Sequence, residues 1–218
     1  LQAPISSYTI SGSTIVFAAA LTTDDVIDFI TVMGDVLNLG QPSDGTVVPA
    51  SLGTTAVTAL TAGTGITSGT NTVYRSDVQK LGNIYHTRIL IDLTGLASSG
   101  SGDIIGKAGT ANSHIGQITA AINGTVLSGK ITCMEAPAGG DPDINLWYAD
   151  EATGAEDAAI TSLTNQVQMC DSGDFAIGTV VGIPTPPAAD KYLYMVTGAA
   201  TNADYTAGKL LIELFGYV

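Results

Sequence analysis

The residues best suited to do chemistry are acidic and cluster in the second half of the chain. Asp141, Asp143 and Asn145 place oxygen ligands at alternate positions, as at the start of a calcium-binding loop. The pattern then departs from that loop, because Leu146 stands where the sharp turn needs Gly and Ala152 where a bidentate Glu is needed. The three oxygen-bearing residues are a candidate metal site, and an acidic loop beside a strand is the alternative that we favour.

The same stretch has residue types that act on or bind carbohydrate. A glycoside hydrolase needs two carboxyl groups roughly 5–10 Å apart, and Glu135, Asp141 and Asp150 are the candidates. Trp147 and Tyr148 lie between two of them in the sequence and are candidates for an aromatic platform under a sugar, with Asp150 as a further contact. Because Trp147 is the only tryptophan, we favour the alternative that it packs in the core or in an interface.

The chain has few residues for other kinds of catalysis, since it contains only two His and two Cys. His86 and His114 are too few for a three-ligand zinc site without help from other residues. The nucleophile motif Gly-x-Ser-x-Gly is absent. Cys133 and Cys170 could pair as a disulfide or remain buried thiols. We therefore expect no catalytic residues, no enzyme activity and no cofactor.

The composition indicates a protein that buries surface against other chains. Only 12% of the residues are charged, yet the formal net charge is −13, because 20 acidic residues oppose seven basic ones. This excess repels nucleic-acid phosphates and anionic lipids, so we expect neither nucleic acid nor a membrane as partner. With so few charged residues, we predict a homo-oligomer. The alternative is a monomer covered by Thr, Ser and Gly.

An alternation with a period of two dominates the chain and predicts strands. In residues 84–93, for example, Ile89, Ile91 and Leu93 face one way, and the polar residues between them face the other. Further strand-like runs, separated by breakers rich in Gly and Pro, cover residues 116–122, 126–135, 144–149, 175–181, 191–197 and 209–218. Many short strands without intervening helices predict an all-β antiparallel sandwich, for which we expect a jelly-roll order.

Two hairpins follow from the turn signals. Residues 13–21 and 25–32 are expected to pair across a short turn, a helix from Thr23 to Met33 being the alternative. Asn123-Gly124, the strongest short hairpin signal in the chain, is expected to join the strands before and after it.

A change of composition divides the chain into two regions. Turn clusters and short low-complexity runs fill residues 34–80, and residues 63–69 are predicted to be a flexible loop. We predict an N-terminal β-hairpin and extended attachment region, residues 1–62, followed by the β-sandwich domain, residues 63–218.

Several segments resemble proteins of one kind. Residues 8–29 carry the pattern YT-SG-TI-F--AL---D-V, which resembles a hairpin unit recurrent in tailed-bacteriophage fibre and particle proteins. Residues 60–66, 89–96, 114–118 and 205–217 resemble segments of structural proteins of environmental phages.

This resemblance implies a virion structural protein, namely a capsid decoration (cement) protein on the capsid exterior, commonly trimeric. Its partners would be the major capsid protein or other virion proteins. A tail-fibre or receptor-binding module for host-surface glycans is one alternative, and a carboxylate-based glycoside hydrolase is another. In an assembly, we expect contacts through the apolar residues Ile15, Phe17, Phe29, Phe215 and Tyr217.

Overall fold

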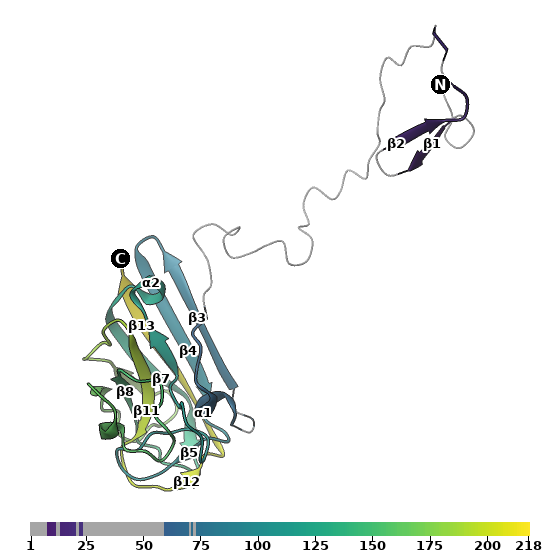
Figure 1. Ribbon diagram of the computed structural model, residues 1–218. Coiled ribbons are helices and arrows are strands. Elements are labelled where there is room, and N and C mark those ends of the chain that lie inside the picture. The colour runs from purple at the N-terminus through teal and green to yellow at the C-terminus, as the bar shows by residue number, and fades with distance from the viewer. Residues whose placement is uncertain (1–7, 12–13, 21, 24–58, 70, 72) are drawn as a thin grey trace. The chain divides into compact units, whose positions relative to one another are not determined.

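The computed structural model describes residues 8–11, 14–20, 22–23, 59–69, 71 and 73–218. The chain divides into two compact units, Leu1–Ser43 and Asp44–Val218, and each is described by itself (Figure 1). We call residues 59–218, the described part of the second unit, the body. Among the described residues, none of the helices has the length and apolar character needed to cross a membrane.

The described part of the first unit is a small antiparallel hairpin. Strand β1 (Tyr8–Ser11) pairs with β2 (Thr14–Phe17), so that Tyr8 lies opposite Phe17. The strand expected over residues 13–21 therefore ends at Phe17 and pairs with the chain before it, where Tyr, Thr and Ile favour an extended backbone. Its expected partner, residues 25–32 with Phe29, lies outside the described residues.

The body is almost entirely β and is built on two antiparallel sheets. The larger sheet has five strands in the order β10-β7-β13-β4-β3. These strands are β3 (Val73–Leu81), β4 (Ile84–Asp92), β7 (Thr125–Ala138), β10 (Val180–Gly182) and β13 (Ala207–Tyr217). The long strand β13 lies between β4 and β7, and its pairing with β7 contains register shifts.

The second sheet has four strands in the order β6-β11-β8-β9. These strands are β6 (Gly116–Ile118), β8 (Ile144–Ala149), β9 (Val167–Cys170) and β11 (Lys191–Thr197). Two short strands, β5 (Ala97–Ser98) and β12 (Ala203–Asp204), form a separate pair.

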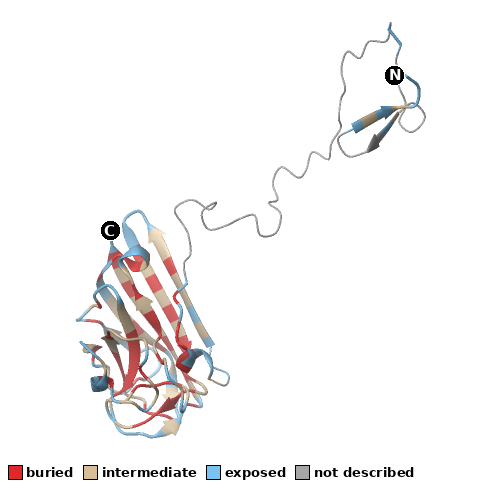
Figure 2. Ribbon diagram, viewed as in Figure 1, coloured by how far each residue is buried: buried red, intermediate tan, exposed pale blue. Residues whose placement is uncertain are grey.

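One hydrophobic core fills the space between the two sheets. The five-stranded sheet contributes Ile89 and Ile91 from β4 and Ile212 from β13, while the four-stranded sheet contributes Leu146 and Leu193. Buried and accessible residues alternate along β4 and β13, as Figure 2 shows in red and tan. The predicted all-β antiparallel sandwich is confirmed. The strand order does not establish a jelly roll, which stays a prediction.

The hairpin predicted at Asn123-Gly124 is wrong. Residues Ala120–Asn123 form a single helical turn, α2, which separates β6 in one sheet from β7 in the other. The Thr119 side chain accepts a hydrogen bond from the Ile122 N–H, as an N-cap does, and Asn123 donates from Nδ2 to Thr87 Oγ1. The positive φ of Gly124 (65°) ends this helix instead of forming a β-turn.

The segment predicted as a flexible loop, residues 63–69, contains a helical turn, α1 (Thr64–Thr67). Ile66 is fully buried in the core, which anchors the turn. Two glycines, Gly63 before the turn and Gly65 within it, are required by close packing, because a Cβ on Gly63 would lie 1.8 Å from the Asn112 carbonyl oxygen. On Gly65 a Cβ would lie 2.1 Å from Ser113 Oγ. The glycines that suggested flexibility therefore permit tight contact.

The outer faces of the two sheets differ. On the four-stranded sheet, residues 99–115 and 150–165 form a covering that we call the loop layer, which includes η2 (Ile160–Ser162). This layer and the sheet share a second hydrophobic cluster, in which Ile104 and Ile160 pack with Tyr194 and Val196. The described residues form no such cluster on the outer face of the five-stranded sheet. We call that face the bare face.

Candidate functional site

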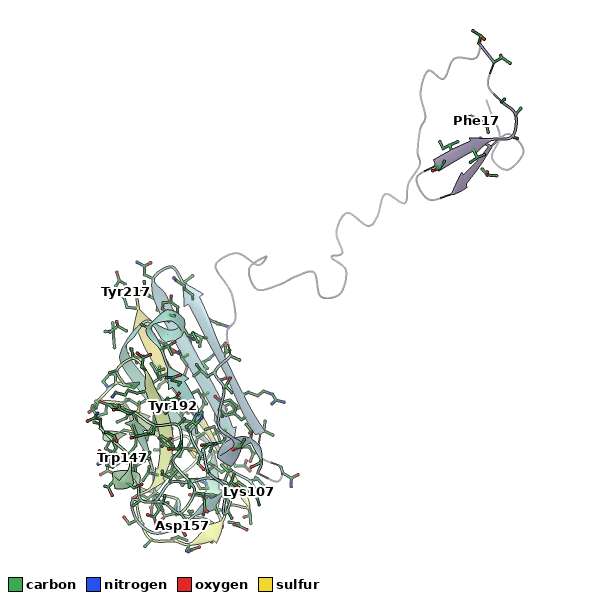
Figure 3. The ribbon with its side chains drawn as sticks, viewed as in Figure 1. Phe17, Lys107, Trp147, Asp157, Tyr192 and Tyr217 are labelled. Atoms are coloured by element: carbon green, nitrogen blue, oxygen red, sulfur yellow. The ribbon has the colours of Figure 1, made fainter. Side chains whose placement is uncertain are left out.

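The structure does not bring Trp147 and Tyr148 together as an aromatic platform. They are neighbours on β8, so their side chains point to opposite faces of the sheet. Trp147 lies opposite Tyr194 and packs in the cluster under the loop layer, whereas Tyr148 lies opposite Leu193 and packs against the main core. Figure 3 shows Trp147 on the body. The preferred interpretation of Trp147 as a packing residue agrees with this position, although its buried Nε1 has no hydrogen-bond partner among the described residues.

Asp150, the polar member of the predicted sugar site, is held by structural partners. Its carboxylate forms an ion pair with Lys191 and accepts a hydrogen bond from Asn165 Nδ2 at 2.6 Å. These two hydrogen bonds hold the pKa of Asp150 below its usual value. The group is therefore ionised at neutral pH and suited to tying the loop layer to β11.

The three carboxylates proposed for glycoside hydrolysis have separate partners. Glu135 forms an ion pair with Lys209 on the bare face. Asp141 is fully buried and accepts hydrogen bonds from the backbone N–H groups of Asp143 (3.0 Å) and Thr201 (3.2 Å). Among the residues that the structure describes, Glu135, Asp141 and Asp150 share no hydrogen-bonding partner that would join two of them in an acid–base pair.

The candidate metal ligands lie near one another but are used by the backbone. Asp141 links its own segment to two others. Its N–H donates to Ser98 Oγ, and its carbonyl accepts from the Tyr205 hydroxyl. Asn145 Oδ1 accepts a hydrogen bond from the Ser172 N–H at 2.8 Å. In the described part of the chain, no three carboxylate, His or Cys groups are placed to hold a metal ion.

Asp143 differs from the other two candidate ligands, because its surroundings disfavour the ionised form of its carboxylate. Burial raises its pKa, and the negative charges of Asp171, Asp141 and Asp174 raise it further. Its buried oxygen Oδ1 has no hydrogen-bond partner in the part of the chain that the structure describes, and a Cβ on Gly198 would lie only 2.1 Å from the carboxylate. This end of the body therefore holds uncompensated negative charge.

A groove on the body surrounds His114. It has a volume of about 360 Å³ and lies between residues 59–62 and the outer side of β6 and β11, with Tyr192 among its lining residues. Burial lowers the pKa of His114, whose ring meets Tyr192 edge to face at 5.0 Å. Among the described residues that line it, the only other ionisable group is the Tyr192 phenol, and none is a carboxylate that could act with the imidazole.

The two cysteines are free and buried. Burial raises the pKa of both Cys133 and Cys170, so both remain neutral thiols at physiological pH. Their packing in the main core leaves them as small apolar side chains.

The bare face carries an ordered network of ion pairs. Arg88 binds Asp77 through two nitrogens, with Nε to Oδ1 at 2.9 Å. Glu213 pairs with Lys130 and with His86, both at 3.0 Å. Burial alone would raise the pKa of Glu213, but its contacts with Lys130 and His86 lower it below the usual value. A third group joins Lys209 to Asp92 and Glu135.

These pairs make the bare face electrically neutral. It carries four basic residues and four acidic residues, which are Arg75, Arg88, Lys130, Lys209, Asp77, Asp92, Glu135 and Glu213. The chain has seven basic and 20 acidic residues in all, so three basic and 16 acidic residues lie elsewhere. The whole formal charge of −13 is therefore carried outside this face.

Apolar side chains interrupt and end this network. His86 stacks on Phe215 with ring centroids 4.7 Å apart, while Leu90 and Leu211 lie opposite each other between the charged rows. At one end of the sheet, large apolar side chains are each more than half exposed: Leu81, Ile84, Leu127, Tyr217 and Val218. Monomeric proteins rarely leave such side chains grouped together, so this end of the body has the character of a contact surface.

The apolar residues predicted to make contacts are therefore distributed as follows. Phe215 and Tyr217 lie on the bare face and at its apolar end, where Figure 3 shows Tyr217. Ile15 and Phe17 lie on β2 of the first unit, and Phe29 lies outside the described residues. Sequence reasoning missed the neutral network, because its pairs join residues from different strands, such as Lys130 and Glu213.

No protein-family model, curated protein or solved structure matches this chain.

Proposed function

We propose that this chain is a non-enzymatic structural protein of a virion, which acts as a decoration protein on the outside of a phage head. The observation that carries the proposal is the bare face, a neutral and partly apolar sheet surface on a strongly acidic chain. Copies of an acidic protein repel one another, and a neutral face with exposed apolar side chains is where they or a shell protein can meet.

The segments that resemble phage structural proteins support the same function. One of them is β13, whose outward residues belong to the bare face. Arg88, Lys130 and Lys209 each already have an ion-pair partner within this face, so covering these pairs leaves none of the three cations without a counter-charge.

The hairpin of the first unit supports attachment through the N-terminal region. Two strands of four residues each are only marginally stable alone in water. Val16 on β2 is 53% exposed. A partner that covers or pairs with this hairpin would stabilise it, as attachment of an N-terminal region to a shell would do.

The decisive experiment locates the chain on particles. Virions of a phage whose genome encodes this sequence should be labelled on the head by antibodies raised against the body. Quantitative mass spectrometry of the same particles should count on the order of hundreds of copies, as surface coverage of a shell built from many symmetric subunits requires. A few copies at the tail would favour the fibre or receptor-binding alternative. Absence from purified particles would refute the proposal.

A further inference from the structure

The bare face contains a hollow that is lined by both apolar and charged side chains. The hollow measures about 380 Å³, and its lining includes the apolar Leu90 and Leu211. Arg75 and Arg88 line it as well, but Asp77 already neutralises Arg88. Arg75 forms no ion pair with any residue that the structure describes, although the other three cations of the bare face all do. The hollow therefore lacks one negative charge.

A protruding loop of the same chain has the matching chemistry. In the loop between β9 and β10, Ile177 is 74% exposed. The loop is nevertheless anchored, because the Phe175 N–H donates to the Pro142 carbonyl at 3.0 Å and the Gly178 N–H donates to the Cys133 carbonyl at 2.8 Å. Phe175 itself is buried in the core. Ile177 is thus an apolar side chain held outward on an ordered support.

Negative charge accompanies this side chain. Asp171 and Asp174 lie in the same loop, are exposed, and form no ion pair with a described residue. Their charges add to the burial that raises the pKa of Asp143. A cation supplied from outside would relieve this repulsion.

The sheet order places the hollow and the loop at opposite edges. The hollow lies over β3, β4 and β13, on the β3 side of the sheet, and the loop leads into β10, the strand at the other edge. We propose that copies of this chain associate head to tail, with Ile177 of one copy seated on Leu90 and Leu211 of the next. Asp174 of the first copy then lies beside Arg75 of the second and supplies the missing charge.

A contact between two different surfaces repeats from copy to copy, and it closes into a ring where the rotation per copy allows. A cyclic trimer is the smallest such ring. The purpose of this association rests on the proposed function. The head-to-tail contact adds to that function the surfaces that join the copies.

The test measures the self-association of the full chain by sedimentation velocity over a range of concentrations. Ile177→Asp, Arg75→Glu and Asp174→Arg should each weaken association by at least about tenfold, as loss of a central anchor or a charge pair does at interfaces. Combining R75E with D174R should restore association, because the charges are exchanged. Ala189→Asp, which adds a negative charge at an exposed turn outside the bare face, should leave association within about threefold of the unaltered chain.

Circular dichroism of each variant checks the fold, which exposed positions should preserve. A chain that stays monomeric at all concentrations, or an oligomer that ignores all three single changes, would overturn the inference. Loss of association that the charge exchange does not restore would also overturn the pairing of Asp174 with Arg75. Location on virions is measured separately, so a monomer found on phage heads refutes only this inference. An oligomer absent from particles refutes only the proposed function.

Discussion

The outer faces of the two sheets differ in what covers them and in the side chains that they carry. The four-stranded sheet turns Trp147 and Tyr194 outward, and the loop layer covers them with a second apolar cluster. The five-stranded sheet turns charged rows outward and pairs them internally. The first face contributes to the stability of the monomer, whereas the second remains accessible and neutral. We infer that stability and assembly are separated between the two faces.

The largest effect that should distinguish the faces is the loss of an apolar side chain under the loop layer. Ile104 is fully buried there, so Ile104→Ala should lower the free energy of unfolding by about 3 kcal/mol. Ile84→Ala, the matched change at the exposed end of the five-stranded sheet, should lower it by less than about 0.5 kcal/mol. Urea denaturation measures both. Equal losses would contradict the assignment of stability to the covered face.

A smaller effect should come from the hydroxyl that joins the sheet to the loop layer. The Tyr194 hydroxyl donates to the Glu151 carbonyl at 2.5 Å and accepts from the Gly154 N–H at 3.2 Å. Burial raises the pKa of Tyr194 to about 12, so the hydroxyl keeps its proton at all ordinary pH values. Tyr194→Phe should lower the free energy of unfolding by about 1–2 kcal/mol.

The matched control is Tyr217→Phe, at a half-exposed position on the apolar end of the bare face. Its thermal midpoint should equal that of the unaltered chain, since the Tyr217 hydroxyl forms no hydrogen bond with any residue that the structure describes. A drop as large as that of Tyr194→Phe would mean that the end of the bare face is also part of the stable framework.

Asp143 and Asp92 should make contributions to stability that change in opposite directions with pH. The folded-state pKa of Asp143 is raised by burial and by its acidic neighbours, so its ionisation costs stability as pH rises from the unfolded value near 4 through the folded one. Asp143→Asn should therefore raise the thermal midpoint at pH 7, and the gain should disappear at pH 3. Thermal unfolding followed by circular dichroism across this pH range measures the change.

Asp92 on the bare face provides the opposite case. Burial tends to raise its pKa, but hydrogen bonds from Thr94 and the charge of Lys209 lower it overall. Its contribution to stability is therefore present above the unfolded pKa, near 4, and is lost as pH falls through the folded value. Asp92→Asn should lower the thermal midpoint at pH 7 and have less effect in acid. If both variants changed the thermal midpoint at pH 7 in the same direction, the expected difference between Asp143 and Asp92 would be contradicted.

The smallest effect should come from a single ion pair of the bare face. Arg88→Ala removes the paired contact with Asp77 at a partly exposed site, so the free energy of unfolding should fall by only about 0.5 kcal/mol. The loss should shrink further at 1 M salt, where the charges are screened. A loss of several kcal/mol, measured by urea denaturation, would show that the network holds the monomer together.

Much of the strand content could be predicted from alternation alone. In β4, every second residue from Tyr85 to Ile91 is buried, and this periodicity is local to the chain. Predictions that relied on turn residues were less reliable. A positive φ at Gly124 is required equally by a β-turn and by the end of a helix, and only the contacts of Thr119 and Asn123 decide between them.

The candidate site was predicted less well than the fold. The sequence indicated an acidic loop around Asp141, but it could not show that Asp141 is fully buried and accepts hydrogen bonds from two backbone N–H groups. Nor could the sequence show that Trp147 and Tyr148 pack in different clusters, because this depends on what covers each face of β8.

By itself, the sequence determined the class of fold, the large acidic excess and the scarcity of catalytic side chains, since periodicity and composition are properties of the chain. The tertiary structure alone decided where the charge lies. Lys130 and Glu213 are 83 positions apart in the sequence, yet pairing of β7 with β13 brings them together. Such pairings concentrate the neutral network on one face and leave the negative charge to the rest of the molecule.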